Sequence, residues 1–312
     1  MVSDVRKTKV NTMSEGKSKI GILGGDGRSA ILTSLLSKKD VECAVWGFPK
    51  RGDLSGRVVK CGKWECAVNG ADAVILPLPV TFDGVRLNCR AISEEEKAVD
   101  YDVRITEIVE AAGKDALILA GKIPASALRF TAEHGKRIKD YYESEEFQIK
   151  NALPTAEGAI GCAMSSLPFT LSQSSVAVTG YGRIGRTLAH RLIALGADVT
   201  CIARSRSDLS WAWVDGCRPL PLDEYRSDPR DFDAIFNTVP HTIFSPEIIA
   251  RLDPDTVFIE LASQSGIDAA AAKGRGIRVI RASSLPGRCS PVTAGKILYE
   301  AVAAILVEEG IL

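Results

Sequence analysis

The residues best suited to binding chemistry are three glycines in the second half of the chain. The stretch VAVTGYGRIG, residues 176–185, has the pattern G-x-G-x-x-G between an expected strand and an expected helix. In that setting the first glycine permits a tight turn, the second lets the backbone approach a pyrophosphate, and the third lets the helix pack on the strand. The loop Gly180-Tyr181-Gly182-Arg183-Ile184-Gly185 therefore predicts a dinucleotide site, with the amides at the helix start facing the anion.

The next expected strand, DVTCIA at residues 198–203, indicates which dinucleotide is bound. An acid at its end would accept hydrogen bonds from both ribose hydroxyls of NAD, but this strand is followed by Arg204, Ser205 and Arg206. A guanidinium can hold a phosphate through two hydrogen bonds, and a serine hydroxyl can add another. We therefore expect NADP(H) rather than NAD(H). The alternative is that both arginines are solvated charges at a helix start.

Two later strand ends complete the expected nucleotide site. FDAIFNTVP ends in Asn237, Thr238, Val239 and Pro240, which would lie at the carboxyl edge of a parallel sheet near the nicotinamide ribose, unless they form a plain turn. TVFIEL is followed by Ala262 and Ser263, which we expect at the same edge. His241 follows Pro240 and could carry a proton near neutral pH, although an exposed loop histidine is the simpler interpretation.

A second glycine pattern, in the first half, is not followed by a residue that could bind the adenosine ribose. Residues 25–30 read G-x-G-x-x-A, but the next expected strand ends in Trp46-Gly47-Phe48, with neither an acid nor a cluster of bases. We expect this loop to serve another ligand, with Arg28 at the helix start available to a carboxylate, or else to be a plain strand-to-helix turn.

Both halves alternate short apolar segments with longer amphipathic ones, which predicts an α/β protein of two Rossmann-like, doubly wound parallel-sheet domains. We expect a flexible leader at 1–18, a substrate and catalytic domain at 19–152, an interdomain helix at 153–172 and an NADP-binding domain at 173–289. The last segment, 290–312, predicts a helix with Ser290 as N-cap and Pro291 in its first turn, running back to the first domain. Its apolar positions could pack internally or form a homodimer seam: Ile297, Leu298, Ala301, Ile305 and Leu306.

The composition excludes several classes of function. Lys plus Arg and Asp plus Glu both total 39, so the chain lacks the basic excess of most nucleic-acid-binding domains. No apolar run approaches the roughly 18 residues of a membrane span, and the polar start lacks a secretory signal. The eight cysteines, including Cys61 and Cys66, are expected to be reduced thiols rather than metal ligands, in a cytoplasmic protein.

Seven motifs taken in order resemble the family of dipicolinate synthase A subunits. They are GILGGDGR (21–28), LPLP (76–79), LPTAEGAI (153–160), VTGYGRIGRTLA (178–189), NTVP (237–240), IELAS (259–263) and SLPGRCSPVTAGKIL (284–298). The glycine loop alone is widespread, but the ordered set is specific. It spans almost the whole chain from residue 19 onward.

The resemblance implies a layout similar to that of D-2-hydroxyacid dehydrogenases. It also implies NADP-dependent oxidation of a dihydrodipicolinate-type precursor, formed from an intermediate of the tetrahydrodipicolinate pathway, to pyridine-2,6-dicarboxylate during sporulation. The smaller, flavoprotein-like B subunit of that synthase would be the partner, in the cytoplasm of the mother cell of a spore former. We also expect the chain to form a homo-oligomer.

A flat dicarboxylate needs two anion-binding groups beside the nicotinamide. Polar residues at expected loops and helix starts are the candidates for substrate binding: Arg28, Thr81, Lys122, Thr155, Arg288, Ser290 and Thr293. Glu157 is the first choice for a catalytic base and His241 the second. Thr155 could instead be an N-cap, Glu157 a first-turn acid and Arg288 a solvated charge.

One departure from D-2-hydroxyacid dehydrogenases favours a different substrate. The loop after TVFIE is Leu261-Ala262-Ser263-Gln264, so their substrate-binding arginine and glutamate-assisted histidine have no counterpart here. Two alternatives stay open: another NADP-linked hydroxy- or amino-acid dehydrogenase, and a dinucleotide-binding subunit that is inactive without its partner.

Overall fold

The structure is a computed structural model that describes residues 17–47, 58–89 and 102–312. The expected leader at 1–18 lies almost entirely outside the described residues. The chain divides into two compact units, built mainly from Thr33–Lys139 and from Asp140–Ala301. Val302–Leu312 is grouped with the first unit and Asp26–Leu32 with the second.

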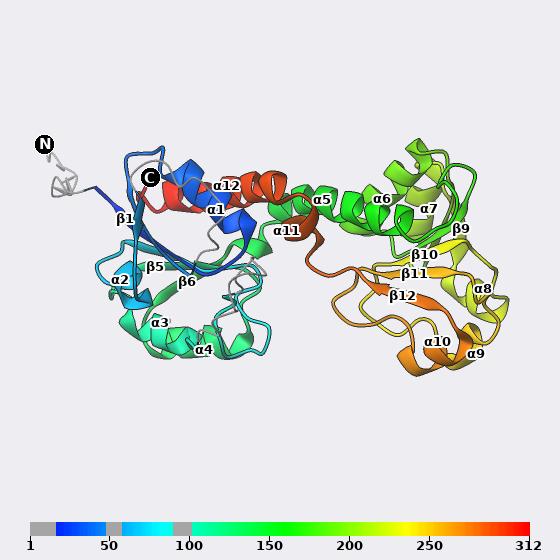
Figure 1. Ribbon diagram of the computed structural model, residues 1–312, viewed down its shortest axis with the longest axis horizontal. Helices are drawn as coiled ribbons and strands as arrows, with labels where there is room; N and C mark the ends of the chain where they lie inside the picture. Colours follow the sequence, from blue (N-terminus) through cyan, green and yellow to red (C-terminus); the bar gives the residue numbers. More distant parts are fainter. Residues whose placement is uncertain (1–16, 48–57, 90–101) are drawn as a thin grey trace, which may run out of the picture. The chain divides into compact units, whose positions relative to one another are not determined.

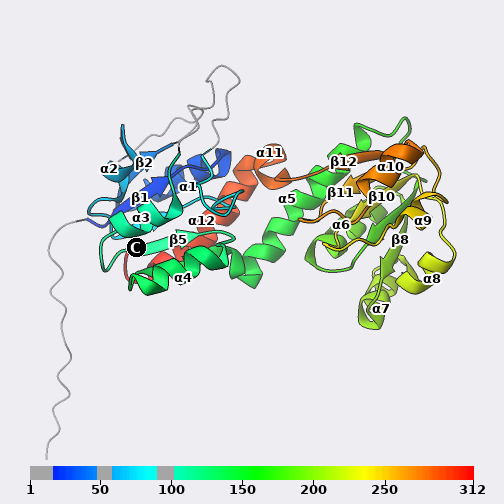
Figure 2. The same ribbon diagram turned by 90° about the horizontal axis from the view of Figure 1, so that it is seen from below.

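The N-terminal unit contains a six-stranded sheet in the order β3-β2-β1-β4-β5-β6. Its register places Ile22 of the central strand between Val45 and Ile75, in parallel pairs. Helices α2, α3 and α4 contribute to one buried cluster on this sheet, and α3 and α4 lie on the same face in Figures 1 and 2. The strands are β1 (Lys19–Leu23), β2 (Glu42–Trp46), β3 (Val58–Lys60), β4 (Ala73–Ile75), β5 (Leu117–Ala120) and β6 (Arg137–Asp140), and the helices are α2 (Trp64–Val68), α3 (Ile105–Ala111) and α4 (Ala125–Glu133). Helix α1 (Gly27–Leu36) is divided between the two units after Leu32.

The C-terminal unit repeats this topology, with the order β12-β11-β10-β7-β8-β9 and parallel pairing throughout. In both sheets the first strand is central and the chain winds outward in both directions, so the predicted pair of doubly wound domains is confirmed. The elements are β7 (Ser175–Thr179), α6 (Arg183–Ala194), β8 (Asp198–Ala203), α7 (Arg206–Val214), β9 (Arg218–Pro221), α8 (Leu222–Ser227), β10 (Ala234–Asn237), α9 (Pro246–Ile249), β11 (Val257–Glu260), α10 (Ala269–Arg275), β12 (Arg278–Arg281) and α11 (Leu285–Cys289).

The C-terminal sheet is covered on both faces, which explains its apolar strands. Val178 and Phe236 belong to the cluster that includes α6 and α7 residues, whereas Ala177, Ile235 and Phe258 belong to the cluster on the other face, with α9 and α10. Figure 1 shows α6 and α7 on one side of this sheet and α9 and α10 on the other. Side chains alternate between faces along a strand, so a sheet buried on both faces requires continuous apolar strands.

The long helix before this sheet begins earlier than expected. Helix α5 spans Glu145–Met164, with Ser144 as its N-cap accepting from the Phe147 amide at 3.3 Å. Pro154 lies inside the helix rather than at its start. Thr155 is therefore not an N-cap, because its hydroxyl donates to the Asn151 carbonyl one turn earlier, at 2.8 Å. Glu157 is likewise a mid-helix residue rather than a first-turn acid.

The last helix, α12 (Pro291–Glu308), begins at the proline predicted for its first turn. Ile297, Leu298 and Leu306 are buried within the chain, while Ala301 and Ile305 are partly buried. Internal packing therefore accounts for Ile297, Leu298 and Leu306, and the homodimer seam stays a prediction.

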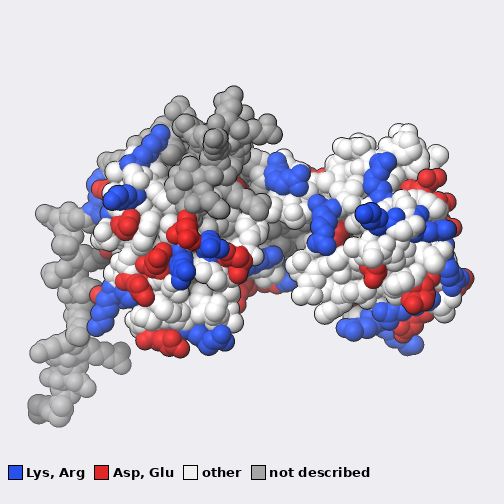
Figure 3. All heavy atoms as spheres, turned by 60° about the horizontal axis from the view of Figure 1, so that its bottom comes forward, with Lys and Arg blue, Asp and Glu red and all other residues white. Residues whose placement is uncertain are grey.

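Surface charges of both signs are interspersed over the described part of the face in Figure 3. This distribution agrees with equal totals of acidic and basic residues. It differs from the continuous basic face that is typical of nucleic-acid binding. No helix within the described ranges is long and apolar enough to cross a membrane.

Candidate dinucleotide site

The glycine loop of the C-terminal unit adopts a turn that requires glycine at its first position. Gly180 follows β7 with φ +82°, in the left-handed region, and its amide donates to the Ile202 carbonyl at 2.9 Å. A Cβ here would lie 2.7 Å from Oγ1 of Thr238. The turn is therefore fixed against the neighbouring strand β8 and against the loop after β10.

The other two glycines have opposite surroundings. A Cβ on Gly185 would overlap the carbonyl oxygen of Gly180, so the helix packs tightly on the turn. A Cβ on Gly182, the N-cap of α6, would meet nothing within 4 Å. The space beside Gly182 is therefore open to a ligand, at the positive end of a 12-residue helix. These residues fit a nucleotide pyrophosphate.

Tyr181, between the two glycines, points into the protein. It is only 5% exposed, and its hydroxyl donates to Oδ2 of Asp215 at 2.9 Å. The same carboxylate pairs with Nε of Arg186 at 2.8 Å and with Nε2 of His190 at 3.1 Å. Neither Asp215 nor His190 was among the candidate residues predicted from the sequence. Burial opposes the charge of Asp215, but these three donors hold the pKa of its carboxyl below the usual range.

The lowered pKa predicts how stability changes with acid. A carboxyl whose folded-state pKa is lowered stabilises the fold above its unfolded pKa of about 4, and this contribution is lost as the pH falls through the folded value. We expect Asp215→Asn to lose about 2 kcal/mol of unfolding free energy at pH 7. We also expect it to lose less stability than the wild type between pH 5 and 3. Urea unfolding at several pH values measures both effects, and parallel pH profiles for the two proteins would contradict the prediction.

The residues predicted to bind the ribose phosphate lie at the end of β8. Arg204 and Arg206 are exposed, and neither side chain has an ion-pair partner among the residues that the structure describes. Ser205 is the N-cap of α7 and accepts from the Asp208 amide at 3.4 Å. Arg204 and Arg206 thus flank the start of α7, next to the glycine turn. The Gly180 amide of that turn donates to the carbonyl of Ile202, in strand β8.

The loops after β10 and β11 are joined by buried polar side chains. Asn237 is fully buried and donates to Val239 O at 3.0 Å and to Glu260 Oε1 at 2.8 Å. Glu260, 3% exposed, also accepts from the amides of Ala262 at 3.0 Å and Gly266 at 2.7 Å. The Asn237 side chain therefore shapes the two loops from within, and its partner Glu260 was missed from the sequence alone. An acid ending an apolar strand was the available signal.

The outer residues of these loops remain open to a ligand. The Thr238 hydroxyl donates to the Thr179 carbonyl at 2.7 Å, but Ser263 is exposed and Ala262 is partly buried. Pro240 and His241 are both exposed. His241 is thus an exposed loop residue, and its role as a proton carrier stays a prediction.

The glycine loop of the N-terminal unit is covered by its own chain. The Gly25 amide donates to the Asn88 carbonyl at 3.1 Å, and a Cβ on Gly24 would lie 2.7 Å from Sγ of Cys89. Gly47 follows β2, at the strand end where a ribose-binding residue would be expected, and it also lies against the Cys89 thiol. Burial raises the pKa of this thiol to about 12. Residues 88–89 thus pack directly against this loop.

Arg28, expected to meet a substrate carboxylate, is paired within the protein. It is 7% exposed, and its Nε and Nη2 donate to Asp26 at 2.9 and 2.7 Å. A Cβ on Gly287 would overlap Oδ2 of Asp26 and lie 3.1 Å from the Arg28 Nε. The Arg28–Asp26 pair therefore packs against Gly287. The next residue, Arg288, is exposed and donates to the Ser283 carbonyl at 3.4 Å.

Two candidate residues line one open hollow of about 580 Å³ in the C-terminal unit. Glu157 comes from α5 and Ser290 from the junction of α11 and α12, with Cys162 and Cys289 beside them. The Glu157 carboxylate is half-exposed and lies 3.5 Å from Nε of Arg191. Thr293 is exposed in the first turn of α12.

The candidates in the N-terminal unit follow β4 and β5. The Thr81 hydroxyl donates to Asp83 at 3.0 Å and accepts from the Gly84 amide, so it is part of a local turn. Lys122 is exposed and has φ +56°, an uncommon conformation for a residue with a side chain. The two loops are joined because the Val80 amide donates to the Gly121 carbonyl at 2.8 Å.

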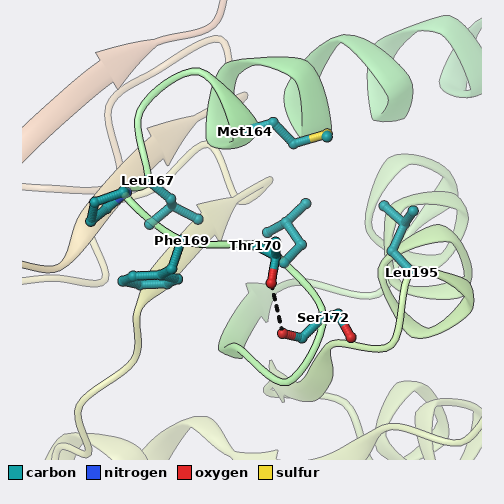
Figure 4. A pocket seen from close by; sticks show the side chains of 8 residues that line it. Met164, Leu167, Phe169, Thr170, Ser172 and Leu195 are labelled. Carbon is teal, nitrogen blue, oxygen red and sulfur yellow. Dashed lines mark hydrogen bonds between the residues drawn. The ribbon is translucent and has the colours of Figure 1, made fainter.

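An apolar hollow near the amino end of β7, away from the carboxyl ends of the strands, lacks the ionisable side chains of a catalytic site. Figure 4 shows Met164, Leu167, Phe169 and Leu195 around it, with the Thr170 hydroxyl donating to the Ser172 carbonyl at 3.3 Å. No ionisable side chain lines it among the described residues. It precedes the amino end of β7, whereas ligands of parallel sheets bind at the carboxyl end.

Comparisons with known proteins identify both halves. Residues 19–142 match the family described as the N-terminal domain of the dipicolinate synthase A subunit, and residues 155–272 match the NAD-binding domain of D-isomer-specific 2-hydroxyacid dehydrogenases. The second match contains the glycine loop, Arg204 and the β10 and β11 loops. The C-terminal half is thus a nicotinamide-dinucleotide-binding domain of the dehydrogenase type.

Full-length relatives support the same assignment. The dipicolinate synthase A subunit of Bacillus subtilis is 30% identical over 93% of this chain and 96% of its own length. The crystal structure of the dipicolinate synthase A subunit from Bacillus halodurans has a TM-score of 0.81 and 29% identity, covering 93% of this chain and 99% of that one. D-lactate dehydrogenase of Escherichia coli shares the fold at 14% identity, with a TM-score of 0.62 over 94% of this chain and 97% of its own.

Proposed function

The chain belongs to the family of dipicolinate synthase A subunits, and on that premise we propose that it oxidises a dihydrodipicolinate-type precursor to pyridine-2,6-dicarboxylate with NADP. One observation carries the proposal. The glycine loop of the C-terminal unit is open at Gly182 and has arginines at the next strand end, whereas its counterpart in the N-terminal unit is covered by residues 88–89.

The residues around the open loop would divide the nucleotide between them. The amides of Arg183 and Ile184, at the start of α6, would bind the pyrophosphate. Arg204, Ser205 and Arg206 would bind a ribose 2′-phosphate, which needs exposed cations such as these. Val239 and Pro240, with Ala262 and Ser263, would border the nicotinamide ribose.

The reaction removes two electrons and two hydrogens from the substrate ring. A bound nicotinamide supplies the acceptor for the hydride. The remaining proton needs a base, and Glu157 is the proposed one because its carboxylate faces an open hollow beside Ser290. His241 is the second choice.

The substrate carboxylates need fixed cations or donors. Arg288, Ser290 and Thr293 are the proposed group, since all three belong to one short segment from the end of α11 to the first turn of α12. Arg28 would act through its pair with Asp26. Thr81, Lys122 and Thr155 remain proposed substrate contacts, although the hydroxyl of Thr155 already donates within its helix.

Two parts of the proposal concern the assembly and its setting. The family name denotes one component of a synthase, so we expect a flavoprotein-like B subunit to complete the enzyme, and a homo-oligomer of this chain stays a prediction. The proposed setting is the cytoplasm of the mother cell during sporulation. The residues after β11, Leu261-Ala262-Ser263-Gln264, contain no arginine, which disfavours the alternative of a 2-hydroxyacid dehydrogenase.

Nicotinamide absorbance tests the proposal. The purified chain is mixed with NADP and either the dihydrodipicolinate-type precursor or a panel of hydroxy and amino acids, with and without the flavoprotein-like partner. Of these substrates, we expect only the dihydrodipicolinate-type precursor to yield NADPH. Turnover of a hydroxy acid, or none with the precursor even when the partner is present, would overturn the assignment.

A further inference from the structure

We propose that Asp215 is a positioning residue for the dinucleotide, because its single carboxylate holds the phosphate loop, helix α6 and helix α7 in one arrangement. The inference rests on the proposed nucleotide binding, and it concerns a residue that lies outside the glycine pattern. Asp215 is the C-cap of α7, and its side chain is only 10% exposed.

The phosphate loop needs an anchor because glycines flank Tyr181 on both sides. Glycine backbones have wide conformational freedom, so the contacts of the one intervening side chain add to those that Gly180 makes with Ile202 and Thr238 in holding the loop. Tyr181 is 5% exposed, and its hydroxyl reaches Asp215 Oδ2 at 2.9 Å and Cys217 Sγ at 3.8 Å. The phenol thus joins the loop to the residues that follow α7.

The other partners of Asp215 lie on the helix that begins at the loop. Arg186 contributes Nε at 2.8 Å and Nη2 at 3.2 Å, and His190, one turn later, contributes Nε2 at 3.1 Å. The Arg186 guanidinium also lies 4.6 Å from the centre of the Trp211 ring, on α7. Helices α6 and α7 are therefore linked both through Asp215 and through this cation–π contact.

The linkage matters because the two helices carry different parts of the proposed nucleotide site. The start of α6 faces the pyrophosphate, whereas α7 begins at Arg206, directly after Arg204 and Ser205. A ligand with phosphates at both places needs a fixed distance between them. Asp215 would set that distance without touching the ligand.

Fragments of the nucleotide separate positioning from general stability. Adenosine 2′-phosphate would engage only the arginines after β8, whereas 2′,5′-ADP would also reach the phosphate loop. In Tyr181→Phe and Asp215→Asn we expect the affinity for 2′,5′-ADP to fall about tenfold, as for the loss of one hydrogen bond to a charged group. The affinity for adenosine 2′-phosphate should stay at the wild-type value.

Calorimetric titration of the full chain, with Tm recorded in parallel, provides the measurement. Asp198→Asn is the matched control, because it removes an exposed ion pair with Arg218 in the same sheet (2.7 Å) and should leave both affinities unchanged. Tyr181→Phe keeps the test decisive if Asp215→Asn folds poorly, since it deletes only a hydroxyl. Wild-type affinity for 2′,5′-ADP in Tyr181→Phe would overturn the inference about Asp215 and leave the proposed function standing. A wild-type chain that binds no NADPH would overturn the proposed function as well.

Discussion

Gly182→Val is expected to abolish nucleotide binding while leaving the fold intact. A Cβ at this position meets no atom of the protein within 4 Å, and its φ of −78° suits any residue. The added branched side chain would instead fill the space that a pyrophosphate needs at the start of α6. We expect NADPH affinity to fall at least about 100-fold, because a filled phosphate site removes several charge-assisted hydrogen bonds.

Two other glycines make the result specific. Gly274→Ala, in α10 of the same unit, also adds a Cβ in open space and should bind NADPH like the wild type. Gly185→Ala should instead lower Tm, because its Cβ overlaps the Gly180 carbonyl. If titration showed Gly182→Val binding NADPH normally, the pyrophosphate would not lie at this loop.

Arg204→Asp is expected to reverse the nucleotide preference. The exposed guanidinium at the end of β8 would be replaced by a carboxylate that repels a 2′-phosphate and accepts from free ribose hydroxyls. We expect NADPH affinity to fall about 100-fold and NADH affinity to rise several-fold, since a charge-assisted pair becomes a like-charge contact. Titration with both nucleotides gives the ratio directly.

Arg218→Asp provides the control for net charge, because Arg218 is exposed on the neighbouring strand β9 and pairs with Asp198. It should leave the ratio unchanged. An unchanged NADPH-to-NADH ratio in Arg204→Asp would mean that its guanidinium is a solvated surface charge.

Much of the fold could be predicted because buried parallel strands are continuous apolar runs. The strands that were missed are short and carry charged or half-exposed residues: Val58–Lys60, Arg137–Asp140 and Arg218–Pro221. They are outer strands of their sheets, so burial does not demand an apolar run there. Helix α5 begins eight residues before the expected start at 153, because Ser144 caps it and Pro154 lies inside the helix.

The candidate site was predictable where local sequence determines the geometry. The roles expected for Gly180 and Gly185 depend on neighbouring backbone: Gly180 has the left-handed φ of the turn, and Gly185, inside α6, packs against the Gly180 carbonyl. The Tyr181–Asp215 contact joins residues 34 positions apart, and the closure of the first loop depends on residues 88–89. Such contacts follow from tertiary packing and leave no periodic signal in the sequence.

A structure of the chain determined with NADPH bound tests the central claim most directly. The account predicts the pyrophosphate on the amides of Arg183 and Ile184, with the 2′-phosphate against Arg204. A nucleotide bound at Gly25 in the N-terminal unit, or a ribose with no cation near its 2′-position, would contradict it.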